Sequence, residues 1–311
     1  MISVILPAYN AQNTIGETIQ SIITQTYRDW ELIVINDGST DDTKGVLMSF
    51  NDERIKYIEN DENKKLIYTL NRGIELATGE YIARMDADDI CHPNRFEKQV
   101  EYMESHPDVI VCGTQISYFG SKSTNYQKLS FPTDDKHLKR MLSLSTCFAH
   151  PTVMIRKSAL IESGCRYDHN YKNAEDYSLW IDLMNYGKFG NLPDYLLNYR
   201  VSDTQVSQPS NPITQASVIR CRRKYVEQYL PSDIAEQLFV NKISINTIKK
   251  VKRLCKNKGV IEGCYLSLKK YTFFSLFYLL LSGDFIKIGT MGTIRFFKRM
   301  IKGCDPVYYS L

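Results

Sequence analysis

Residues 79–89, Gly-Glu-Tyr-Ile-Ala-Arg-Met-Asp-Ala-Asp-Asp, join an apolar stretch to a run of carboxylates. Residues 81–85 have the length and apolar character of a buried strand, and the acidic residues follow directly. Carboxylates crowded so closely repel one another unless a cation lies among them. Oxygen ligands favour Mg²⁺ or Mn²⁺. The stretch predicts a strand that ends at a divalent-cation site, with a solvated acidic turn as the alternative.

Around this stretch, strands alternate with helices. Short apolar runs predict strands at residues 3–7, 31–35, 54–58, 81–85, 109–112 and 152–155. Helical spacing predicts helices after residue 13, after residue 41, over 66–77 and over 175–186. We expect Gly79 to close the third of these helices as a left-handed cap. The alternation predicts an α/β fold with a Rossmann-like, mainly parallel sheet flanked by helices.

The ends of the predicted strands carry polar and aromatic groups. In an open parallel sheet, ligands bind beyond the carboxyl ends of the strands. The first strand ends in Pro7-Ala8-Tyr9-Asn10, the second in Asp37-Gly38-Ser39, and the fourth in the acidic run. A nucleotide could use all three, with its base on a ring, its imide on a carboxylate and its diphosphate near a cation. Taken alone, Tyr9 is equally a loop tyrosine, and the glycine turn after Asp37 is an ordinary turn.

Charge divides the chain into two parts. Residues 211–311 carry 18 Lys and Arg against 6 Asp and Glu, whereas the whole chain has a net charge of only +4. A helical, basic C-terminal region over 206–311 therefore predicts an anionic partner. The eight cysteines form no C-x-x-C pair, the first residues lack the pattern of a signal peptide, and we expect no membrane-spanning segment, because no apolar run is long enough. These features lead us to expect a cytoplasmic protein.

Seven motifs in a fixed order resemble the family 2 inverting glycosyltransferases, which have the GT-A fold. They are P-A-Y-N at 7–10, V-I-N-D-G-S-T-D-D-T at 34–43, L-N-R-G-I at 70–74, G-E-Y-I-A-R-M-D-A-D-D at 79–89, A-H-P-T-V-M-I-R at 149–156, A-E-D-Y-S-L-W at 174–180 and L-P-D-Y-L-L-N-Y-R at 192–200. The resemblance covers about residues 1–205. It implies a catalytic domain there, with a nucleotide-sugar-binding half over 1–115 and an acceptor-binding half over 116–205.

The resemblance also implies roles for individual residues. Asp176 would be the catalytic base, with Glu175 beside it, and Asp86 and Asp88 would bind Mn²⁺ or Mg²⁺. Tyr9 would stack on the base, and Asp37 would accept a hydrogen bond from the imide of the base. Asn71 or Arg72 would lie near the base or ribose. The full nucleotide-sugar set is Pro7, Ala8, Tyr9, Asn10, Asp37, Asn71, Arg72, Asp86, Ala87 and Asp88. His150 and Arg200 match family positions near the acceptor and the diphosphate.

The implied reaction moves one sugar from a nucleotide-diphosphate donor, commonly UDP-linked in this family, to a glycan. The family often has Y-R-x-H, but this chain has Tyr199-Arg-Val-Ser202, and Gly164-Cys-Arg-Tyr167 replaces a frequent G-G-Y. No Q-x-x-R-W occurs, so transfer is expected to be non-processive. The resemblance implies a lipid-linked acceptor on a polyprenyl diphosphate, in O-antigen or capsule synthesis. Two alternatives are a sugar nucleotidyltransferase and a non-catalytic carbohydrate- or membrane-binding protein.

The C-terminal region predicts a peripheral association with an anionic membrane on the cytoplasmic side. Residues 271–281 are apolar but too few to span a bilayer. If helical, the next segment has a basic face, formed by Lys287, Arg295, Lys298, Arg299 and Lys302. Its opposite face is apolar, formed by Ile286, Ile294, Phe296, Phe297, Met300 and Ile301. Packing on the catalytic domain or a homodimer interface would use the same apolar residues. Nucleic acid is not expected as a partner.

Overall fold

The computed structural model describes residues 1–120, 128–201, 211–238 and 245–254. The strands are β1 (Ile2–Ala8), β2 (Trp30–Asn36), β3 (Ile55–Glu59), β4 (Tyr81–Arg84), β5 (Ile90–Cys91), β6 (Val109–Gly120), β7 (Lys128–Leu129), β8 (Met154–Arg156) and β9 (Lys188–Val201). The helices are α1 (Ile15–Ile23), α2 (Thr43–Met48), α3 (Leu66–Leu76), α4 (Arg95–Ser105), α5 (Asp135–Met141), α6 (Lys157–Ser163), α7 (Glu175–Leu183), α8 (Pro212–Glu227), α9 (Ser232–Leu238) and α10 (Ile245–Leu254). Short 3₁₀ turns lie at His150–Thr152 and His169–Tyr171.

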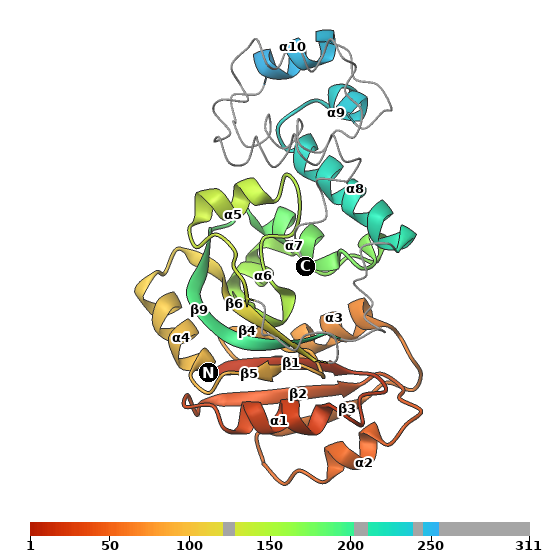
Figure 1. Ribbon diagram of the computed structural model, residues 1–311, viewed down its shortest axis with the longest axis vertical. Coiled ribbons are helices and arrows are strands. Elements are labelled where there is room, and N and C mark those ends of the chain that lie inside the picture. Colours follow the sequence, from red (N-terminus) through yellow and green to blue (C-terminus); the bar gives the residue numbers. More distant parts are fainter. Residues whose placement is uncertain (121–127, 202–210, 239–244, 255–311) are drawn as a thin grey trace.

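One sheet runs through the described part in the order β3-β2-β1-β4-β8-β6-β9-β5, with β7 paired to β6 (Figure 1). The strands β1 to β4 pair in parallel, as the strand–helix alternation predicted. Beyond β4 the sheet is mixed, because β8 is antiparallel to both β4 and β6, whereas β6 and β9 are parallel. The α/β fold with a Rossmann-like half is therefore confirmed, and the second half adds antiparallel strands.

Both faces of the sheet are covered, which explains the unbroken apolar strands near the N-terminus. On β1, Val4 and Leu6 pack with Ile15 and Ile19 of α1 on one face. Ile5, which points the opposite way, packs with residues of α3 on the other face. The carboxyl ends of β1, β2 and β4 are thereby fixed between two helical layers.

The strands β6 and β9 extend well beyond the apolar runs in the sequence. Only 109–112 was predicted for β6, and β9 was not predicted as a strand. Buried polar side chains in this region have internal partners. Gln115 donates from Nε2 to the carbonyls of Phe131 and Leu192, at 3.2 and 2.9 Å, and its Oε1 accepts from the Phe131 amide at 2.6 Å. Such hydrogen bonds allow a polar residue inside a strand that hydropathy alone does not reveal.

The predicted left-handed cap at Gly79 is wrong. The residue that follows α3, Ala77, has an extended backbone conformation, and Gly79 is not among the positive-φ glycines. Glycine is needed for a different reason, since a Cβ there would lie 2.7 Å from the backbone nitrogen of Ser3. Close approach of two backbone segments therefore explains this glycine.

The first described helix after β9 packs on the sheet-bearing part of the chain. In α8, Lys224 donates from Nζ to Asp182 at 2.6 Å and to Ser178 at 2.8 Å, both on α7. Figure 1 shows α8 leading away toward α9 and α10 at the end of the molecule far from β1–β3. The predicted domain boundary near 205 and the predicted membrane segments after 270 lie outside the described residues. Within the described part, no helix combines the length and hydropathy needed to cross a membrane.

Candidate active site

The loops that follow β1 and β2 are tied together by hydrogen bonds. The amide of Asn10 donates to Ser39 Oγ at 3.0 Å, and Asn10 Oδ1 accepts from the Thr40 amide at 2.8 Å. Asn10 has a φ of 50°, which asparagine tolerates better than most residues. These bonds fix the predicted Pro7–Asn10 segment beside Asp37 and leave Tyr9 49% exposed. The Tyr9 ring is therefore available for stacking.

Asp37 is buried and organises the loop between β3 and α3. Its Oδ1 accepts from Asn60 Nδ2 at 2.6 Å and from the Lys64 amide at 2.9 Å, and its Oδ2 accepts from the Lys65 amide at 2.9 Å. A carboxylate offers about four lone-pair directions. Three are therefore used within the protein, and about one is left for the predicted contact with a base.

Lys65 has an unusual backbone conformation, with φ 73° and ψ 162°. This region is essentially restricted to glycine, and a side chain there costs on the order of 1–3 kcal/mol. The hydrogen bond from the Lys65 amide to Asp37 fixes this conformation. The strain lies in the loop that borders the predicted nucleotide site.

We expect Lys65→Gly to raise the free energy of unfolding by about 1 kcal/mol, because glycine adopts this conformation without strain. The matched control is Lys64→Gly, since the neighbouring amide also bonds to Asp37 but Lys64 is not among the positive-φ residues. That control should lower stability, because glycine adds freedom to the unfolded chain. Chemical denaturation of both variants measures the difference, and equal losses would show that Lys65 is unstrained.

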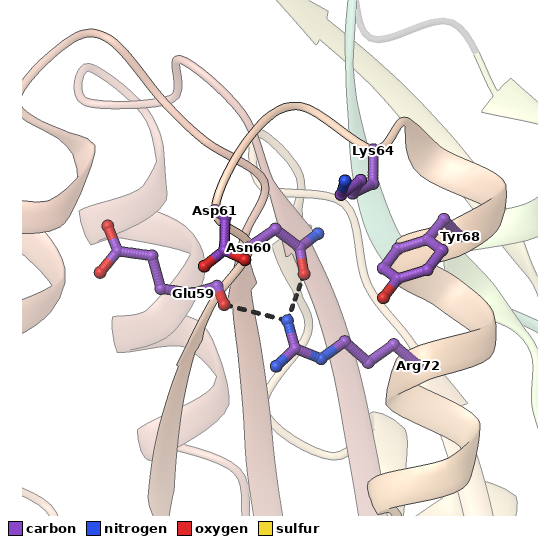
Figure 2. A pocket seen from close by; sticks show the side chains of 6 residues that line it. All are labelled: Glu59, Asn60, Asp61, Lys64, Tyr68 and Arg72. Carbon is purple, nitrogen blue, oxygen red and sulfur yellow. Dashed lines mark hydrogen bonds between the residues drawn. The ribbon is translucent and has the colours of Figure 1, made fainter.

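A small pocket of about 180 Å³ opens between β3 and α3 (Figure 2). Its lining is polar and consists of Glu59, Asn60, Asp61, Lys64, Tyr68 and Arg72. Arg72 Nη1 donates to the Glu59 carbonyl at 2.9 Å and to Asn60 Oδ1. Because Asn60 also donates to Asp37, it links that carboxylate to Arg72. Two cationic side chains and a tyrosine thus border the pocket.

Asn71 and Arg72 are neighbours on α3 but have different surroundings. Asn71 donates from Nδ2 to the carbonyl of Tyr167 at 2.9 Å, and its Oδ1 accepts from the amide of Tyr167 at 3.1 Å. Both ends of this side chain therefore tether the segment before α7. Of the two residues predicted for the base or ribose, Arg72 lines the pocket and Asn71 has a bridging position.

The acidic run after β4 gathers three carboxylates. Asp86, Asp88 and Asp89 each offer an oxygen, and these oxygens lie within 4.8 Å of one another. Burial, followed by the charge of Asp86, raises the pKa of Asp88 to about 6. Asp89 is buried, and its Oδ2 has no hydrogen-bond partner. A divalent cation fits this site because it would compensate the crowded charge and bind the buried oxygen. Asp89 thus joins the predicted metal-binding pair, Asp86 and Asp88, as a third carboxylate.

Two arginines adjoin the acidic turn. Arg200 on β9 donates from Nε to the carbonyl of Asp88 at 2.8 Å, and its amide donates to Asp89 Oδ1 at 2.8 Å. Arg84, at the end of β4, forms a two-point ion pair with Asp86. A further bond, from Thr14 Oγ1 to the Ala87 carbonyl at 2.9 Å, joins the turn to the segment after β1. The structure therefore brings the predicted residues Asp86, Ala87, Asp88 and Arg200 together.

His150 is half-buried and pairs with the buried Tyr167. Its Nε2 lies 2.8 Å from the hydroxyl of Tyr167. Burial, followed by the charge of Arg84, holds the pKa of His150 well below its ordinary value. A neutral imidazole beside a hydroxyl can position a polar ligand but adds no charge to the site.

Glu175 and Asp176 begin α7, where negative charge is favourable next to the helix N-terminus. Glu175 is only 6% exposed, and burial together with the charge of Asp176 raises its pKa to about 7. Asp176 is more accessible, and its Oδ2 accepts from Thr146 Oγ1 at 3.0 Å. Burial also raises the pKa of Asp176. Two adjacent carboxylates with raised pKa values are suited to proton transfer near neutral pH.

Several residues of this site were not singled out from the sequence. They are Asn60, Lys64, Tyr68, Arg84, Asp89 and Tyr167. One available signal was Arg84, a charged residue inside an otherwise apolar strand. Another was Asp89, which stands in the same acidic run as Asp86 and Asp88. Asn60, Lys64 and Tyr68 gave no signal, because their proximity depends on the path of the β3–α3 loop.

The fold is that of the GT-A glycosyltransferases. The structure of TarS from S. aureus in complex with UDP-GlcNAc matches the fold with a TM-score of 0.62, over 76% of this chain and 69% of that chain, at 20% identity. The chain matches the profile described as "Glycosyl transferase family 2" over residues 3–164, and it belongs to that family.

Relatives that are named as glycosyltransferases agree with this assignment. The chain is 34% identical to an uncharacterized glycosyltransferase of Haemophilus influenzae, over 90% of each chain. It is 32% identical to the amylovoran biosynthesis glycosyltransferase AmsE of Erwinia amylovora, over 67% of this chain and 79% of AmsE. It is 35% identical to the O-antigen biosynthesis glycosyltransferase WbnJ of Escherichia coli, over 65% and 80% of the two chains. The protein is therefore a glycosyltransferase, which takes a sugar from a donor to an acceptor.

Proposed function

We propose that this glycosyltransferase transfers one sugar, with inversion, from a UDP-sugar to a lipid-linked glycan during synthesis of a cell-surface polysaccharide. The observation that carries the proposal is the combination of the Asp86–Asp88–Asp89 cluster with the carboxylate pair that begins α7. The names of AmsE and WbnJ support the polysaccharide context, and the UDP-GlcNAc bound by TarS supports a UDP donor.

In this proposal, the nucleotide lies across the carboxyl ends of β1, β2 and β4. Tyr9 stacks on the base, and Asp37 accepts a hydrogen bond from the imide N–H with the lone pair that the loop leaves unused. Arg72 contacts the base or ribose from the β3–α3 pocket. The diphosphate lies at the acidic turn, where Arg200 adds positive charge.

The acidic turn would hold Mn²⁺ or Mg²⁺ through Asp86, Asp88 and Asp89. When bound, such an ion compensates the charge of a departing nucleoside diphosphate. Asp176 accepts the proton of the acceptor hydroxyl as its oxygen attacks the anomeric carbon, and this attack from the opposite face inverts the configuration. The Thr146 hydroxyl orients the carboxylate of Asp176, and burial raises the pKa of that carboxylate.

A panel of nucleotide sugars, assayed for release of the nucleoside diphosphate, tests the proposal. We expect release from UDP-sugars that needs Mn²⁺ or Mg²⁺ and increases with a polyprenyl-diphosphate glycan. Synthesis of a nucleotide sugar from a nucleoside triphosphate would instead identify a nucleotidyltransferase. Failure to turn over any donor, with carbohydrate binding retained, would favour the non-catalytic alternative.

UDP should protect the protein against thermal unfolding better than CDP or ADP, because only uracil presents an imide donor to Asp37. At a hundredfold excess over Kd, bound ligand stabilises by about 2.7 kcal/mol. Differential scanning fluorimetry with Mn²⁺ and each nucleotide measures the ranking. Equal protection by all three nucleotides would remove Asp37 from base recognition.

We also propose that the C-terminal region over 206–311 holds the enzyme on the inner face of the cell membrane. Its net charge of +12 over residues 211–311 supports attraction to anionic lipid. The full chain should co-sediment with anionic liposomes at low salt and less at high salt, whereas a chain ending near Asp203 should not. Full-length protein that ignores anionic liposomes would favour a packing or dimer role for the apolar residues.

A further inference from the structure

Arg84 is a buried cation among carboxylates, and its backbone is fixed from both sides. Its amide donates to the carbonyl of Val153 at 3.0 Å, and its carbonyl accepts from Arg95 Nη2 at 3.1 Å. The side chain is only 6% exposed. A guanidinium in such surroundings has little freedom to move, so its charge is a permanent feature of the site.

The ion pair with Asp86 neutralises this charge only in part. Both terminal nitrogens of Arg84 contact Asp86, whereas its buried Nε has no hydrogen-bond partner. Asp86 is also one of the three clustered carboxylates. A divalent cation at that cluster would share Asp86 with the guanidinium and would experience its positive charge at short range.

The same charge reaches the proposed base. Burial raises the pKa of both Glu175 and Asp176, and the positive charge of Arg84 opposes this rise. Thr146 donates its hydroxyl to Asp176, and the thiols of Cys147 and Cys221 and the hydroxyl of Tyr167 also lie near this carboxylate. The cations of the adjoining helix α8 have partners of their own, because Lys224 pairs with Asp182 and Arg222 donates to the Leu144 carbonyl.

We propose that Arg84 is a positioning residue whose positive charge pairs with Asp86 and competes there with the divalent cation. The same charge stabilises the ionised form of Asp176. This inference rests on the proposed function. Its consequence is that the divalent cation binds weakly alone and binds well together with the donor, whose diphosphate restores the negative charge that Arg84 removes. Binding of the cation and binding of the nucleotide sugar would then favour each other.

The test measures binding of Mn²⁺ without nucleotide, by electron paramagnetic resonance, to the full-length protein. Arg84→Gln and Arg84→Met remove the charge, and Arg84→Lys retains it. The neutral variants should bind Mn²⁺ roughly tenfold more tightly or better, because a unit charge a few ångströms from a divalent ion is repelled at least that strongly. The Lys variant should remain near the wild type. Arg156→Met is the matched control, since Arg156 on the adjacent strand β8 pairs with Glu80.

Activity should change in the opposite direction. The neutral variants should turn over more slowly, and the acid limb of their pH–rate profile should move to higher pH, because Asp176 loses a charge that favours its ionised form. A purely structural Arg84 would instead weaken Mn²⁺ binding and leave the pH profile in place, and that result would overturn the inference. Circular dichroism confirms which of the two neutral variants folds.

The two proposals fail in different ways. If the wild type transfers no sugar from any donor, the proposed function is wrong, yet the ranking of Mn²⁺ affinities still tests Arg84. If the wild type is active and the neutral variants bind Mn²⁺ no more tightly, only the role of Arg84 is wrong.

Discussion

Replacing Asp176 by Asn should lower turnover by about 10²–10⁴-fold, which is the usual contribution of a positioned general base. The amide cannot accept a proton, but it keeps the shape of the carboxylate and can still accept from Thr146. Binding of the donor should survive, because this residue faces the acceptor in the proposed mechanism. Single-turnover assays and UDP titrations separate the two quantities.

The pH dependence should identify the same pair. A base works only when ionised, and the pKa of both Glu175 and Asp176 is raised, that of Glu175 to about 7. Activity should therefore fall on the acid side of neutrality, at a higher pH than an ordinary carboxylate would give. The two carboxylates are adjacent, so the observed limb belongs to the pair rather than to one residue.

A control on the same helix makes this result specific. Asp182 of α7 pairs with Lys224 on α8, away from the acidic turn, so Asp182→Asn should keep near-normal turnover. If Asp176→Asn also kept near-normal turnover, the base would lie elsewhere. Glu175→Gln would then be the next variant, although Glu175 is the more buried of the two.

The sequence predicted the N-terminal half of the fold well because β1, β2 and β4 are buried on both faces. The consecutive residues Val4, Ile5 and Leu6 all enter apolar cores, on alternating faces of the sheet, so burial leaves an unbroken apolar run in the sequence. In contrast, β6 and β9 bury polar residues such as Gln115, whose partners come from distant segments. Hydropathy cannot show those partners, and the lengths of these strands were missed.

The site shows the same division. Residues at strand ends, such as Asp37 and Asp88, could be singled out from the sequence because the carboxyl edge of a parallel sheet is where ligands bind. What Asp37 does within the protein could not be foreseen, since its three hydrogen bonds depend on how the loop over 60–65 folds back. Asn71 likewise resembled a ligand contact, whereas the structure shows it bonded to the backbone of Tyr167.

Metal dependence should be as pronounced as the loss of the base. Chelation should abolish transfer, and Mn²⁺ or Mg²⁺ should restore it. Asp88→Asn should lower turnover by at least about 10³-fold, because a bound cation stabilises the developing charge by several kcal/mol. Asp194→Asn, on β9 and paired with Lys98, is a control that removes a carboxylate outside the cluster.

A measurement of thermal stability distinguishes the loss of turnover in Asp88→Asn from misfolding of the variant. Burial and the charge of Asp86 raise the pKa of Asp88 to about 6. Above that pH Asp88 is ionised in the folded protein, and this ionisation lowers the stability of the fold. A neutral side chain relieves that repulsion, so the metal-free Asp88→Asn protein should unfold at a temperature no lower than the wild type at pH 7.5. Added Mn²⁺ should stabilise the wild type more than the variant. Full activity of the wild type in excess chelator would remove the metal from the mechanism and leave Arg84 and Arg200 as the cations nearest the diphosphate.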